Sequence, residues 1–115
     1  MSSKQKAKIK QLARQIKNNP GDSFSKFALA LEFRKEGELK KARILFEDIL
    51  SSDSDYVGVY YHLGKLYEAL DRFNDAKQLY RKGIAVADQQ EERRTEKELK
   101  EALQQLQIEM EEQSS

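Results

Sequence analysis

Apolar residues recur every three or four positions along most of the chain, with polar residues between them. The segment 4–17 shows the pattern most simply, with Ile9, Leu12 and Ile16 on one face and lysines around them. Because an α-helix completes one turn in about 3.6 residues, this spacing predicts an amphipathic α-helix. The same period predicts further helices over about 23–35, 39–50, 56–70, 73–87 and 89–111. We therefore expect an all-α protein of about six helices.

Residues that stop helices separate the predicted segments. Pro20 follows the first segment, and Asp22 or Ser23 is suited to cap the next helix by accepting its free N–H groups. The links at 37–38 and 71–72 are two residues long. Links this short require the helices on either side to be antiparallel neighbours, which predicts two helix hairpins.

Two segments repeat one arrangement of large and small residues, 34 positions apart. The matched pairs are Leu29 with Leu63, Ala30 with Gly64, Phe33 with Tyr67, Ala42 with Ala76, and Phe46 with Tyr80. Together with Tyr60, the second copy resembles the signature of the tetratricopeptide repeat family. Its physical basis is that two antiparallel helices cross closely only at small side chains, which predicts a crossing at Gly64 and Ala76.

The resemblance implies an α-solenoid of antiparallel helix hairpins, with two full repeats between flanking helices. The implied parts are a half-repeat helix at 4–20, repeats at 23–56 and 57–88, and a capping helix at 89–111. We expect all of them to form one domain over residues 1–115. Lys26 stands where the family has a large residue, which predicts looser packing in the first repeat.

The resemblance also implies a concave groove lined by the first helix of each repeat. The residues at those positions are Phe24, Phe27, Leu31 and Arg34 in the first repeat, and Tyr61, Lys65 and Glu68 in the second. Grooves of this kind bind extended peptides or helices of a partner. The alternative is that Phe24 and Phe27 belong to the core and are covered by the first helix. The sequence leaves the two interpretations open.

Charge is distributed unevenly although the formal net charge is only +1. Residues 1–20 hold six Lys or Arg and no acid, while residues 91–112 hold eight Glu against four Lys or Arg. We interpret both segments as solvated helix faces. No aromatic residue interleaves with the lysines, so we do not expect nucleic-acid binding. Attraction between opposite ends of two molecules is a further interpretation.

No pattern in the chain indicates catalysis. Cys is absent and His62 is the single histidine, which excludes disulfides, thiolate chemistry and His-based metal sites. His62 itself is interpreted as a helix-surface residue rather than a pH-sensitive contact. We expect no enzyme activity, metal or cofactor. The N-terminal lysines precede no apolar run, so we expect a soluble, cytoplasmic protein without a membrane span.

Together these features predict a protein-interaction adaptor that binds a peptide or helix in a concave groove. Arg34 and Lys65 favour an acidic partner. We expect a monomer or a weak homodimer. The alternative is a structural helical-repeat protein that associates with itself.

Overall fold

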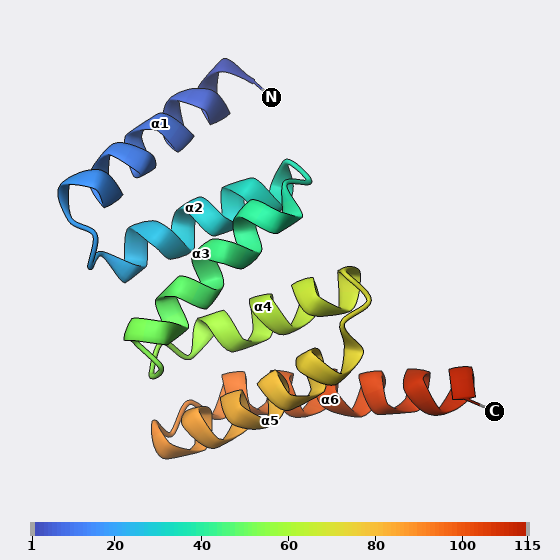
Figure 1. Cartoon of the computed structure of the whole chain (residues 1–115). Helices are drawn as coiled ribbons and strands as arrows, with labels where there is room; N and C mark the ends of the chain where they lie inside the picture. Colours follow the sequence, from blue (N-terminus) through green and yellow to red (C-terminus); the bar gives the residue numbers. More distant parts are fainter. Residues whose placement is uncertain (1, 115) are drawn as a thin grey trace. The chain divides into compact units, whose positions relative to one another are not determined.

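The computed structural model in Figure 1 describes residues 2–114 and shows only helices and their connections over that range. The helices are α1 (Ser3–Asn18), α2 (Ser23–Lys35), α3 (Leu39–Ser52), α4 (Gly58–Ala69), α5 (Phe73–Gln89) and α6 (Arg93–Ser114). The predicted all-α class and helix order are confirmed. The largest boundary error concerns α6, which begins at Arg93 rather than at 89 because α5 continues to Gln89.

The chain divides into two compact units, Met1–Ser54 and Asp55–Ser115. In the first unit α2 packs against both α1 and α3, as Figure 1 shows. In the second unit α5 packs against both α4 and α6, and α6 also contacts α4. The division falls close to the boundary predicted between the repeats. The organisation as one domain stays a prediction.

Three of the four connections between helices within the units are tight turns of the same kind. Gly37, Asp71 and Glu91 each adopt a left-handed backbone, with φ of 77°, 59° and 57°. After each of them, the next N–H donates to a carbonyl five residues back, and the N···O distances are 2.8 to 2.9 Å. This is the hydrogen bond of a Schellman cap. The turn at Glu91 makes α5 and α6 a third hairpin, although the 34-residue repeat has ended there.

Small residues mark the places where helices cross in the second unit. A Cβ added to Gly64 would overlap the ring of Tyr80, so the predicted crossing of α4 and α5 is confirmed. Gly83 marks a contact that was not predicted, because a Cβ there would lie 2.6 Å from Tyr60 Cβ and 3.0 Å from Leu99 Cδ1. These close approaches pack α5 tightly against α4 and α6.

The core of the first unit lies between α2 and α3 and is completed by α1. Its buried apolar side chains are Leu12, Leu29, Ala30, Ala42, Phe46 and Ile49. Asp22 caps α2 by accepting hydrogen bonds from Ser25 N at 3.0 Å and Ser25 Oγ at 2.6 Å, which confirms one of the two predicted caps. These hydrogen bonds hold the pKa of Asp22 below its ordinary value of 3.8.

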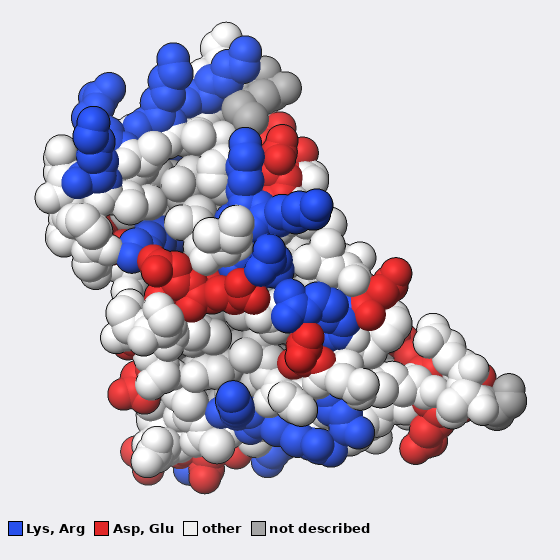
Figure 2. Space-filling model, in the orientation of Figure 1, with Lys and Arg blue, Asp and Glu red and all other residues white. Residues whose placement is uncertain are grey.

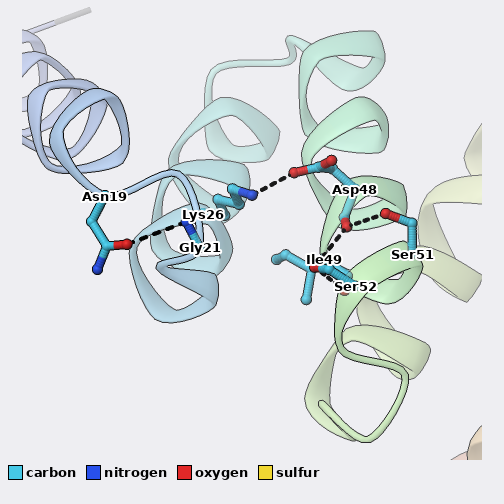
Figure 3. A network of polar contacts seen from close by, with 7 residues as sticks. All are labelled: Asn19, Gly21, Lys26, Asp48, Ile49, Ser51 and Ser52. Atoms are coloured by element: carbon cyan, nitrogen blue, oxygen red, sulfur yellow. Dashed lines mark hydrogen bonds and ion pairs between the residues drawn. The ribbon is translucent and has the colours of Figure 1, made fainter.

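Lys26 stands where the family has a large residue, and it joins α2 to α3 through an ion pair. The residue is buried, and its Nζ lies 2.6 Å from Asp48 Oδ2, as Figure 3 shows. Asp48 also anchors the end of α3, because Ser51 Oγ donates to its carbonyl oxygen at 2.7 Å. An ion pair therefore replaces the apolar contact that a large residue would make at this position.

Candidate functional site

An exposed apolar surface runs along α2, and we call its residues Phe24, Phe27 and Leu31 the α2 stripe. Their spacing of three and four residues places them on one helix face, away from buried Leu29 and Ala30. Phe24 is 71% exposed, whereas Phe27 and Leu31 are half-buried. The interpretation of Phe24 as core is therefore wrong.

Phe27 lies at the inner edge of the α2 stripe. Its ring meets the ring of buried Phe46 edge-on, with 5.9 Å between the centroids and 61° between the planes. Phe27 thus contributes to the contact between α2 and α3 and also presents part of its ring outside. Helix α1 packs on α2 through Leu12 but leaves Phe24 uncovered. The α2 stripe is therefore part core and part surface.

Basic residues surround Glu32 where α2 meets α1. Glu32 is 4% exposed, and it lies 2.8 Å from Lys8 Nζ of α1 and 3.7 Å from Lys35 Nζ. The hydrogen bond from Lys8 and the charge of Lys35 hold the pKa of Glu32 below its ordinary value of 4.5, against the opposing effect of burial. A recess of about 490 Å³ lies here between α1 and α2, lined by Lys4, Lys8 and Lys35 among others. Arg34, the fourth predicted groove residue of this repeat, is half-buried near the end of α2.

The three predicted groove residues of the second repeat form one line along α4. Lys65 Nζ lies 5.8 Å from the centroid of the Tyr61 ring and 3.8 Å from Glu68 Oε2. Glu68 also accepts a hydrogen bond from the hydroxyl of Tyr80 on α5. Its side chain is only 18% exposed, so Glu68 lies mainly in the contact between α4 and α5 rather than in solvent. Tyr61 and Lys65 remain half-buried at the surface.

Tyr61 and Lys65 form one wall of a recess whose other wall is α6, which we call the α4/α6 recess. Its volume is about 300 Å³, and α6 contributes Glu98, Glu101, Ala102 and Gln105. Sequence reasoning missed these α6 residues because the 34-residue repeat does not extend to them. Two glutamates against one lysine make the lining net acidic. The signal that could have found them is the spacing of three and four residues between 98, 101 and 105.

These surfaces present aromatic, aliphatic and charged side chains. Within residues 2–114 no three His, Cys, Asp or Glu side chains converge in a way that could hold a metal ion. His62, next to Tyr61 on α4, meets that ring edge-on with 5.7 Å between centroids. No helix of the described range has the length and apolar character needed to cross a bilayer.

Comparisons with known proteins identify relatives of this chain. The model of the family described as tetratricopeptide repeat matches residues 33–106. A tetratricopeptide repeat-containing protein of Methanocaldococcus jannaschii is 34% identical over 77 residues, which is 67% of this chain and 24% of that protein. The chain thus spans about a quarter of the length of this curated relative.

Solved structures show the same fold. A tetratricopeptide repeat domain protein from Salinibacter ruber is 44% identical, with a TM-score of 0.73 over 76% of this chain and 89% of that one. The TPR2B domain of yeast Sti1, solved in complex with pHsp70, has a TM-score of 0.81 over 88% of this chain and 81% of that one. At 14% identity the likeness to Sti1 shows the fold alone.

Proposed function

Because the chain belongs to the tetratricopeptide repeat family, we propose that it is a protein-interaction adaptor that binds a peptide or helix of a partner protein. The observation that carries this function is the exposure of Phe24, at 71%, beside half-buried Phe27 and Leu31. Large apolar side chains gathered on one exposed face mark interaction sites. The structure of the Sti1 domain with pHsp70 supports a binding role for this fold.

The α2 stripe would supply most of the affinity. Apolar anchors dominate binding energies when they enter a fully desolvated contact, and charges at the rim mainly set partner choice. Arg34 and Lys35 lie at the end of α2 that follows the stripe. A partner segment with apolar residues followed by acidic ones therefore fits this surface best.

The α4/α6 recess would be a second binding surface with different chemistry. Tyr61 offers an aromatic ring, and Glu98 and Glu101 supply negative charge. The lining of this recess is net acidic, with Glu98 and Glu101 against Lys65, which disfavours an acidic partner here. We therefore assign the preference for acidic residues to the α2 stripe and a preference for basic residues to this recess. We propose a binding role without catalysis, carried out in the cytoplasm.

Paired variants test this function. The partner is first captured from native cells with the parent protein and identified by mass spectrometry, and its affinity is then measured with purified components. We expect Phe24→Glu and Leu31→Glu to weaken that affinity by about tenfold or more while helix content stays unchanged. The matched control is Ile44→Glu on α3, which is 57% exposed and lies outside the α2 stripe. Equal affinities for all three variants would contradict the assignment of the α2 stripe.

A further inference from the structure

The outer face of α1 carries only basic charge, and we call its residues Lys6, Lys10, Arg14 and Lys17 the α1 basic face. These residues are all exposed and lie on the side of α1 turned away from Leu12 and α2. None of them forms an ion pair within the described part of the chain. Figure 2 shows Lys and Arg side chains standing out along α1. The α1 basic face is thus a row of uncompensated positive charge.

A stripe of the opposite charge runs along α6. Its glutamates are Glu98, Glu101, Glu109 and Glu112, which we call the α6 acid stripe, and Gln105 continues the same spacing between them. Steps of three and four residues place all five side chains on one face of the helix. Glu98 and Glu101 belong to the α4/α6 recess beside Tyr61. From residue 101 onward the chain contains no Lys or Arg.

Ion pairs within the chain neutralise Glu98 and Glu101 of the α6 acid stripe only weakly. Glu98 lies 3.4 Å from Arg94, whose side chain is 93% exposed, and such a pair contributes little. Glu109 accepts a hydrogen bond from Gln105 at 3.0 Å. Glu101 forms no ion pair with any described residue. The acid stripe therefore presents negative charge at a recess that is large enough for a long side chain.

The α1 basic face is shorter than the α6 acid stripe. Lys6 and Lys17 are eleven residues apart, whereas Glu98 and Glu112 are fourteen residues apart. At about 1.5 Å per residue, the two rows are about 16 Å and about 21 Å long. One helix laid along the other would therefore bring the whole α1 basic face beside acidic side chains of α6, with neutral Gln105 in the middle of the stripe.

We propose that the α1 basic face of one molecule docks along the α6 acid stripe of a second copy of the chain. The α4/α6 recess would receive a Lys or Arg side chain beside Glu98 and Glu101. The recess is one of the two surfaces assigned to partner binding above, so this inference rests on that function. A second copy fits because its basic helix supplies a complementary row, while the net charge of +1 leaves little repulsion between copies.

Charge reversal on the full chain tests the docking. Sedimentation velocity over a range of concentrations at low salt should show association, and about 0.5 M salt should dissolve it, because screening shortens the range of these charges. We expect Lys6→Glu with Lys10→Glu, and separately Glu98→Lys with Glu101→Lys, to weaken association by about tenfold or more. Mixing the two variants should restore association between unlike molecules, because the reversed faces again attract.

The matched control is Lys40→Glu with Lys82→Glu, two exposed lysines on α3 and α5, which changes the net charge as much as the α1 variant. A loss of association in this control equal to that in the α1 variant would overturn the docking. A parent protein that stays monomeric at every concentration would also overturn the docking, even if its α1 basic face binds nucleic acid. A monomeric parent whose captured partner still depends on Leu31 would leave the proposed function standing. If the parent associates but Leu31→Glu does not change the affinity for the captured partner, the docking stands and the assignment of the α2 stripe fails.

Discussion

Two phenylalanines one helix turn apart have different roles on α2. Phe24 is 71% exposed, whereas Phe27 is half-buried against Phe46. We expect Phe24→Ala to change the free energy of unfolding by less than about 0.5 kcal/mol, as exposed substitutions do. Phe27→Ala should cost about 2 kcal/mol, because truncation leaves a partial cavity beside Phe46. Urea melts of both variants measure the difference, and equal midpoints would contradict this division of roles.

Gly64 provides a second prediction at the scale of the residue. Because a Cβ at this position would overlap the ring of Tyr80, Gly64→Leu should overpack the α4–α5 crossing and cost about 1–3 kcal/mol. The control is Gly21→Ala, since the nearest atom to a Cβ there is Asn19 Oδ1 at 3.7 Å. Denaturant melts should show a lowered midpoint for the first variant only. A Gly64→Leu protein that melts like the parent would mean that the helices cross elsewhere.

The tight turns that join the helices contain residues whose substitution should change the stability of the protein. Asp71 and Glu91 hold the left-handed conformation that favours glycine, which Gly37 already supplies in the first hairpin. We expect Glu91→Gly to stabilise the protein by about 0.5–1 kcal/mol. Asp71→Gly should gain less, because aspartate tolerates this conformation better than glutamate. Thermal melts measure the order of the melting temperatures of these variants. Gly37→Ala serves as the reverse control, and we expect it to lower the melting temperature.

Contact between α1 and α2 should depend on pH through Glu32. Its pKa is lower in the folded protein than its ordinary value of 4.5, chiefly through the hydrogen bond from Lys8. The resulting stabilisation is therefore present above about pH 4.5 and is lost as the pH falls through the lower folded pKa. Glu32→Gln removes this linkage. We expect the parent to lose more stability than the variant between pH 7 and pH 3, and parallel losses would contradict it.

At the scale of the whole molecule, α6 must complete the core of the second unit. Leu99, Ala102 and Leu106 are buried, and α6 packs on both α5 and α4. Each buried leucine contributes about 1.5–3 kcal/mol, so a chain ending at Asp88 should lose cooperative unfolding or aggregate. A chain ending at Glu112 keeps these contacts and serves as the control. Calorimetry compares the two, and equal melting temperatures would show that α6 is dispensable.

Local pattern accounts for most of the fold that could be predicted. The period of apolar residues predicted the six helices, and the 34-residue offset predicted the crossing at Gly64. Asp22 was one of the two expected caps. These features depend on neighbours within a few residues, or on a spacing visible in the chain itself, so the sequence by itself determined them.

Tertiary structure decided which faces are covered. Helix α2 carries apolar residues on two sides, and only the placement of α1 and α3 left Phe24 exposed while drawing Phe27 toward Phe46. Likewise, Glu68 is held by Tyr80 rather than left for a partner, and Glu98 and Glu101 meet Tyr61 across a recess. Each outcome joins residues at least twelve positions apart. The physical reason is that helix periodicity gives a side chain's direction, whereas burial depends on which distant helix lies there.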